Sequence, residues 1–318
     1  MQRKVIKQGK DTLTITLPRG WTKKYDIFPG DELNLEEQER SLILTTEKGF
    51  SLQKTIINTK DLDARMIWRK FGSAYRTGYD EIHIIFDDPK KKYPDICKSF
   101  TDPKGTLSTI ELIQNLNRFI GIEIIDQKAT YCKLKDLGKT NEAEFDNALR
   151  RIFLLLLSIS SDTLEGIKNN DKETLLILES TTDTNIDRFS DFCLRILNKK
   201  GYKDFKKTSE IYSIILLLEF LGDEYKYISR NSANIKLNNS TIKLIEELNN
   251  LLKEYYELFF KYEEKNIEKL HEKIFDIDKK ISQAFTKANN NEKELFFNLH
   301  NINNIIKDLI QLTLDLKT

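Results

Sequence analysis

Four acidic residues occur in two pairs, each at the spacing of one helical turn. The first pair is Glu179 and Asp183, and the second is Glu219 and Asp223. Because an α-helix advances by about 100° per residue, the two members of each pair share one face. Apolar side chains occupy that face too, so Glu179 is expected inside a hydrophobic stripe and Asp183 at its edge. A carboxylate that faces a core is costly unless it is paired, protonated or bound to a cation.

Two interpretations of these carboxylates stay open. In the first, all four converge from neighbouring helices on an oxygen-rich site for a hard or borderline cation such as magnesium, manganese or iron. In the second, they form salt bridges with Lys or Arg of a facing helix, or lie at a solvated edge. A divalent metal or an iron cluster is therefore a hypothesis, because the spacing alone does not require one.

A later stretch of the chain repeats the spacing without the chemistry. Glu272 and Asp276 lie one turn apart, but the isoleucines of that helix fall on the opposite side, so both acids are expected to face solvent. At the positions that align with the second acidic pair stand His300 and Asn304, which supply no carboxylate. We interpret His300 as a polar residue at an edge and expect no second metal cluster.

A different chemistry is concentrated in residues 1–24. This segment holds seven basic side chains against one acid, a local net charge of +6, whereas the rest of the chain carries −5 and the whole chain +1. A basic end on an otherwise acidic protein indicates a polyanion partner at that end. The basic residues are Arg3, Lys4, Lys7, Lys10, Arg19, Lys23 and Lys24.

Other classes of function have little support. The chain contains no Gly-rich phosphate loop, no GxSxG motif and no Cys/His pair that could act as nucleophile and base. We therefore expect no catalytic activity, and a metal-dependent enzyme is the least favoured interpretation. The longest apolar run, residues 152–157, is far shorter than the roughly 20 residues of a membrane span. Since no secretory signal precedes the first strand, we expect a cytoplasmic protein.

The distribution of proline predicts the elements that position these residues. A chain of 318 residues indicates two or three domains. All five prolines lie at or before Pro103, and nothing after about residue 139 forbids long helices. We predict a multidomain α+β protein with domains at 1–48, 49–138 and 139–318.

The first domain, residues 1–48, is expected to be built of short strands. Residues 12–17 alternate threonine with leucine or isoleucine, which is the pattern of a half-buried strand, and Pro18 ends it. Two further strands are expected at 33–35 and 42–44. So few apolar side chains cannot form an adequate core alone, so this domain is expected to dimerise.

The remaining domains differ in their periodicity. The middle domain is predicted to be a small α/β unit of unknown role with a surface loop over 87–105. Its strands are expected at 55–57, 81–86 and 120–125, and its helices near 61–76 and 106–118. The last domain is predicted to be all helical, with two repeats at about 141–230 and 238–318 that form a pair of three-helix bundles. The six helices are expected at about 142–169, 172–199, 205–230, 240–260, 264–287 and 292–316.

The first domain resembles a known family of DNA-binding domains. A basic strand lies in residues 4–9 and a strand that ends in proline in residues 12–18. A short helical turn around residues 21–27 and a Pro-Gly-Asp turn within residues 27–33 follow them. This order is similar to that of the AbrB/SpoVT/MazE swapped-hairpin family. The resemblance implies a dimeric, interdigitated β-barrel that binds DNA through its basic face. Carried over, the phosphate and groove contacts are Arg3, Lys4, Lys7, Lys10 and Arg19, with Lys23 and Lys24 as weaker candidates.

The helical domain resembles the PhoU family. Residues 218–225 read Leu-Glu-Phe-Leu-Gly-Asp-Glu-Tyr, which is similar to the Leu-Glu-x-x-Gly-Asp signature of that family. Glu179-x-x-x-Asp183 resembles its companion motif, and residues 146–153 resemble the first helix of its archaeal form. An AbrB-like head joined to PhoU repeats resembles the archaeal phosphate-uptake regulators. The resemblance favours the metal interpretation and implies control of a phosphate ABC transporter, with the ATPase subunit as a candidate partner.

These features predict a phosphate-responsive transcription regulator that controls phosphate uptake as a homodimer or higher oligomer. It would bind DNA through its first domain and sense phosphate status through the PhoU-like helices. The alternative is a PhoU-type adaptor that binds the phosphate transporter and uses the AbrB-like domain only to dimerise. Salt dependence separates the two, because about six phosphate contacts give a log–log slope near −5.

Overall fold

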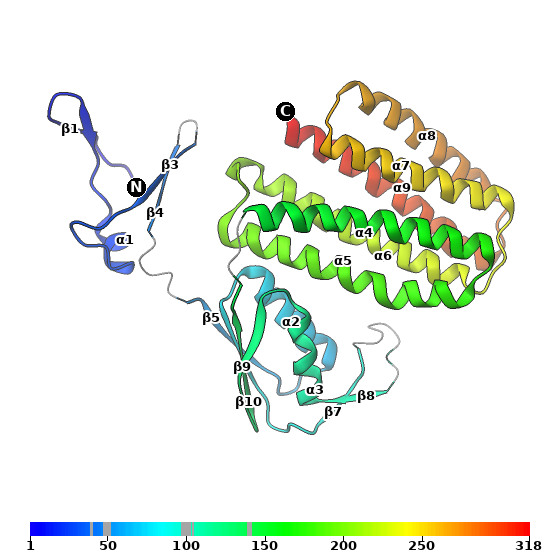
Figure 1. The fold of residues 1–318 in the computed structure, drawn as a ribbon, viewed down its shortest axis with the longest axis horizontal. Helices are drawn as coiled ribbons and strands as arrows, with labels where there is room; N and C mark the ends of the chain where they lie inside the picture. Colours follow the sequence, from blue (N-terminus) through cyan, green and yellow to red (C-terminus); the bar gives the residue numbers. More distant parts are fainter. Residues whose placement is uncertain (39–40, 47–51, 97–102, 104, 139–141) are drawn as a thin grey trace. The chain divides into compact units, whose positions relative to one another are not determined.

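The computed structural model describes residues 1–38, 41–46, 52–96, 103, 105–138 and 142–318. The chain divides into two compact units, Met1–Gln53 and Lys54–Thr318 (Figure 1). Its mixed α+β character is confirmed, with long helices from residue 142 onward. None of the described helices is long and apolar enough to cross a membrane.

The N-terminal unit consists of two hairpins and a short helix. Strands β1 (Ile6–Gln8) and β2 (Thr12–Thr14) pair antiparallel, as do β3 (Asn34–Gln38) and β4 (Ser41–Thr45). Helix α1 (Arg19–Lys24) begins directly after Pro18 and lies between the hairpins in sequence. The Pro-Gly-Asp turn is closed by Asp31, whose carboxylate accepts from the Phe28 backbone N–H at 2.7 Å. Within one chain the described strands form separate two-stranded sheets and no closed barrel.

The second unit opens with a four-stranded sheet. Its strand order is β5-β6-β10-β9, in which β5 and β6 are parallel and the other neighbours antiparallel. The bounds are β5 Lys54–Asn58, β6 Glu81–Ile85, β9 Ile122–Lys128 and β10 Tyr131–Asp136. Helices α2 (Ala64–Thr77) and α3 (Thr109–Gln114) pack on one face, where residues such as Phe71, Ile82 and Ile113 form the core.

Two expectations about this region are wrong in part. The predicted surface loop over 87–105 contains strand β7 (Lys92–Pro94), which pairs with β8 (Thr106–Ser108). Tyr93 is buried there against α2 and α3, so the segment covers part of the core. Strand β10 was not predicted at all, and the helix expected over 106–118 is confined to α3 and a 3-10 turn at Asn115–Arg118.

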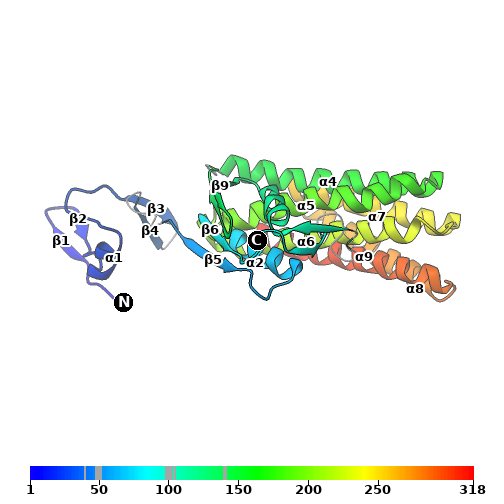
Figure 2. The same ribbon diagram turned by 90° about the horizontal axis from the view of Figure 1, so that it is seen from below.

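The six predicted long helices are confirmed to within a few residues at their ends. They are α4 Glu142–Asn169, α5 Lys172–Lys200, α6 Thr208–Ser232, α7 Asn239–Phe260, α8 Lys265–Phe285 and α9 Asn290–Lys317. Asp171 and Asn238 cap α5 and α7 by accepting from backbone N–H groups, which fixes where these helices begin. Figure 2 shows α4 to α9 lying alongside one another, and their apolar faces share one hydrophobic core.

Helices α4–α6 and α7–α9 form two triplets that pack on each other mainly through α6 and α9. The three-domain division with a boundary near residue 138 stays a prediction, and residues 139–141 lie outside those described. Residues 54–318, the α/β part and the helices together, form one compact unit.

Candidate functional site

The signature over residues 218–225 lies on α6, and packing explains part of it. Leu218 and Tyr225 are buried in the helical core. A Cβ atom on Gly222 would lie 3.0 Å from the Ile186 side chain on α5, closer than most real contacts. Glycine at this position therefore lets α5 and α6 approach each other closely.

The two acids of the signature are more accessible than Leu218 and Gly222. Glu219 and Asp223 are half-buried on α6, and both have polar or ionic interactions. The Asp223 carboxylate lies 3.4 Å from Lys226 Nζ, one turn further along the helix. Lys226 belongs to the same helix, so this contact is not the salt bridge to a facing helix that the second interpretation expects, and that interpretation stays open.

The predicted metal site stays a prediction. The side chains of Glu179 and Asp183 lie outside the described part of the structure, so their distances to Glu219 and Asp223 are not defined. Among the described residues, no group of three or more His, Cys, Asp or Glu side chains could hold a metal ion.

The second helical triplet differs at the corresponding positions. Glu272 and Asp276 are exposed, as predicted, and Asp276 pairs with Lys280 at 2.7 Å. His300 lies at an edge, with Nδ1 3.0 Å from an Asp278 oxygen. Asn303 stands where the first triplet has glycine, and its buried amide donates to the Ile274 carbonyl at 3.1 Å.

The seven basic residues of segment 1–24 are all exposed, which is compatible with the predicted DNA contacts but does not test them. None of the described residues of this unit is buried. Large apolar side chains are exposed on its strands, among them Leu13 at 70% and Leu35 at 63%. The described unit has no hydrophobic core of its own.

A polar junction that sequence reasoning missed joins α5 to the α/β part. Arg195 of α5 is almost fully buried. Its guanidinium donates to the carbonyls of Tyr75 and Tyr79, at 2.6 and 2.8 Å, and to the Asp136 carboxylate at 2.6 Å. Tyr75 and Tyr79 lie at and just beyond the C-terminal end of α2, where carbonyls lack helical partners and cations are favoured. Arg195 thus caps the C-terminal end of α2 and links it to Asp136 at the end of β10.

The next turn of α5 extends this junction. Asn198 donates to the Arg76 carbonyl at 2.8 Å, and Lys199 donates to Asp80 at 2.6 Å. The Lys199 side chain packs against Gly78. Glycine is favoured there for two reasons: its φ of 102° is one that other residues rarely adopt, and a Cβ atom would lie only 2.6 Å from Lys199 Cγ. The α/β part is therefore fixed to the C-terminal half of α5 by specific polar contacts.

The acidic side chains of the junction are paired with basic ones. Burial alone would raise the pKa of Asp136, but the hydrogen bond and charge of Arg195, with Lys199, hold it below its usual range. Arg76 pairs with Asp191 at 2.7 Å, yet burial keeps the pKa of Asp191 raised. A local sequence clue was available, since Arg195 interrupts the apolar run of residues 192–197, but its partners are about 60 to 120 residues away.

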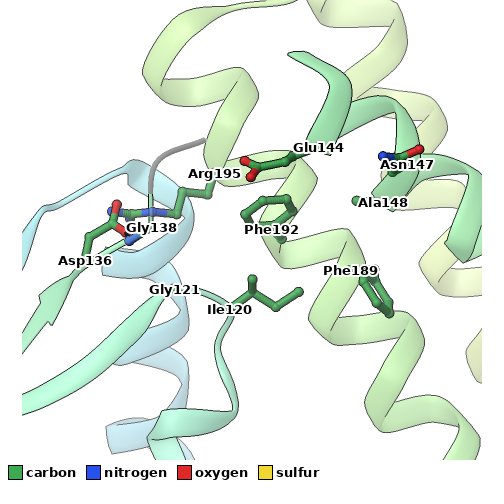
Figure 3. Close-up of a pocket in the computed structure, with 10 residues that line it drawn as sticks. All are labelled: Ile120, Gly121, Asp136, Gly138, Glu144, Asn147, Ala148, Phe189, Phe192 and Arg195. Carbon is green, nitrogen blue, oxygen red and sulfur yellow. Dashed lines mark hydrogen bonds and ion pairs between the residues drawn. The ribbon is translucent and has the colours of Figure 1, made fainter. Parts of the chain in front are cut away.

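A pocket of about 350 Å³ opens beside this junction. Figure 3 shows its lining side chains, which come from three parts of the unit. Residues at the ends of β9 and β10, the first turns of α4 and the C-terminal half of α5 all contribute. They are Ile120, Gly121, Asp136, Gly138, Glu144, Asn147, Ala148, Phe189, Phe192 and Arg195.

Together these features define a mixed α+β protein in which a six-helix array carries an acidic signature and is joined to a small sheet domain. No family model matches the chain, and no curated protein does. Among solved structures, it is similar to the phosphate transport system regulatory protein PhoU from Streptococcus pneumoniae, with a TM-score of 0.45 and 16% sequence identity. The similarity covers 55% of this chain and 94% of that one.

Proposed function

We propose that this protein regulates phosphate uptake by protein–protein contact, through a surface on α6 that binds the ATPase subunit of a phosphate ABC transporter. The family resemblance of residues 218–225 suggests the partner. The observation that carries the proposal is the difference in burial among those residues. Leu218 and Gly222 are buried where α6 packs in the helical core, whereas Glu219 and Asp223 are half-buried acids that are partly accessible to a partner.

The negative charge of Glu219 and Asp223 suits them to the recognition of a protein partner. Acids at the edge of an interface steer partners and fix register, and a buried hydrogen-bonded charge is costly to truncate. The same acids would contribute to a cation site if Glu179 and Asp183 converge with them. A bound cation would then belong to the same surface, and its presence would be measured by metal analysis of the purified protein.

The test is binding of the purified chain to the transporter ATPase subunit from its own organism, followed by biolayer interferometry. The variant Glu219→Gln/Asp223→Asn should bind about tenfold more weakly or worse. Glu272→Gln/Asp276→Asn is the matched control, because it removes an acid pair of the same spacing from the second triplet. Equal losses in both variants, or no binding by the wild type, would refute the proposed function.

The N-terminal unit is proposed to dimerise the protein. Its exposed leucines and isoleucines and its lack of a described core support this role, because a second copy would bury them. The finer expectation, an interdigitated swapped-hairpin barrel, belongs to the same proposal.

DNA binding by this unit is the second candidate function, and the cluster of seven exposed basic residues favours it. Wild type and Lys7→Ala/Arg19→Ala should be titrated with salt on phosphate-transporter promoter DNA. A log–log slope near −5 in the wild type, reduced by about one for each lost phosphate contact, would support it. No binding at moderate salt would leave the adaptor function alone.

A further inference from the structure

The pocket beside the junction has an apolar floor made of aromatic and aliphatic side chains. Phe189 and Phe192 of α5, Ile120 before β9 and Ala148 of α4 supply most of this surface (Figure 3). Its volume, about 350 Å³, is within the usual range for small-molecule sites, roughly 300–1,000 Å³. Aromatic faces favour offset contact with another ring, and they also attract a nearby cation.

The polar groups of the pocket disfavour an anion. Asp136 and Arg195 line one side, but they are bonded to each other at 2.6 Å, and the second Asp136 oxygen accepts from the Gly138 N–H at 3.0 Å. Glu144 and Asn147 line the α4 side, and both are exposed. The lining therefore carries two carboxylates against one guanidinium, and the guanidinium is already engaged. A phosphate or carboxylate ligand would enter an acidic environment.

Glu144 has the chemistry to hold an ammonium group. A carboxylate offers about four lone-pair sites and can accept from several donors at once, so its existing interaction does not preclude another. Glu144 lies in the first turn of α4, where its charge also offsets the positive end of that helix. Asn147, one turn on, supplies a further amide donor and acceptor.

We propose that this pocket binds a small aromatic amine, with its ring on Phe189, Phe192 and Ile120 and its ammonium at Glu144. Such a ligand would contact the α/β part, α4 and α5 at the same time. Binding would therefore stabilise the junction that Arg195 forms. The site is separate from the acids of α6 and would be present whether or not the protein binds a transporter.

The test uses three probes with the same ring and different charge: phenethylamine, 2-phenylethanol and 3-phenylpropanoate. Calorimetric titration of the full chain should give the tightest binding for the amine, about tenfold weaker binding for the alcohol and none for the acid. Inorganic phosphate, titrated alone, should not bind at this pocket or compete with the amine.

Two variants locate the binding. Glu144→Gln should lower the affinity for phenethylamine to that for 2-phenylethanol and leave the alcohol unchanged, whereas Glu165→Gln, an exposed acid elsewhere on α4, should change neither. Ala148→Leu, with folding checked by its thermal transition, should abolish binding of both probes by filling the floor. The proposal is overturned if none of the probes binds, if the acid binds as well as the amine, or if Glu165→Gln acts like Glu144→Gln.

Discussion

The two units of this protein differ most in what they bury. None of the described residues in Met1–Gln53 is buried, and its strands expose several large apolar side chains. Lys54–Thr318 contains continuous cores and even buries a guanidinium among matched partners. Because burial of apolar surface is the main favourable term in folding, the second unit contains the cores that stability requires, and the described part of the first unit contains none.

This difference separates a compact unit with its own cores from a unit that, in our proposal, is completed by a second copy. The second unit fixes its geometry with specific polar contacts at the α5 junction. The described residues of the first unit expose large apolar side chains, and its basic side chains in segment 1–24 are exposed too. Variants in the two units should therefore affect different measurements.

The largest effect is expected from Arg195→Ala. It leaves Asp136 without its buried partner and two carbonyls near the end of α2 without a donor, so the free energy of unfolding should fall by about 3–5 kcal/mol. Denaturant unfolding followed by circular dichroism would measure it, with the exposed Arg151→Ala as control. A loss below about 1 kcal/mol would show that the junction is not a rigid element.

Alanine substitutions of one glycine in each unit should differ in their cost to the free energy of unfolding. Gly78→Ala introduces both left-handed backbone strain and a clash with Lys199, and it should cost about 2–4 kcal/mol. Gly30→Ala in the N-terminal unit has similar strain at φ 96° but nothing within 4 Å, so about 1 kcal/mol is expected. Equal costs in thermal or denaturant unfolding would contradict the difference in packing.

Acid sensitivity should be traceable to Asp136. Its pKa is lower in the folded protein than in the unfolded chain, so its contribution to stability is complete above the unfolded value of about 3.9. That contribution is lost as the pH falls through the lower folded value. Unfolding measured from about pH 5 down to about pH 2, which spans this loss, should show a shallower acid limb in Asp136→Asn; an unchanged limb would mean that other carboxylates dominate.

The sequence predicts the elements of the second unit better than its junction. The six long helices follow from uninterrupted 3.6-residue periodicity and from breaks at residues such as Gly201. Strand β10 was missed because only Cys132 and Leu134 mark its inner face. The pairing of Arg195 with Asp136 joins residues 59 apart, and no local pattern reports such a contact.

The acidic signature illustrates the same limit. The i,i+4 spacing places Glu219 and Asp223 on one face of α6. The isoleucines on the opposite side of α8 correctly predicted that Glu272 and Asp276 are exposed to solvent. Whether the first pair meets carboxylates from α5 depends on side-chain positions that periodicity cannot define. The metal site is thus a prediction from resemblance and helical geometry together.

The most direct test of this account is the molar mass of the full chain by light scattering, for the wild type and for Leu13→Asp/Leu35→Asp. The account predicts a wild-type dimer, twice the chain mass of 37.3 kDa, and a monomeric variant whose second unit melts at an unchanged temperature. Both substituted positions are exposed, so the variant should not disturb the chain itself. A monomeric wild type, or a variant that stays dimeric, would contradict the claim that a second copy completes the N-terminal unit.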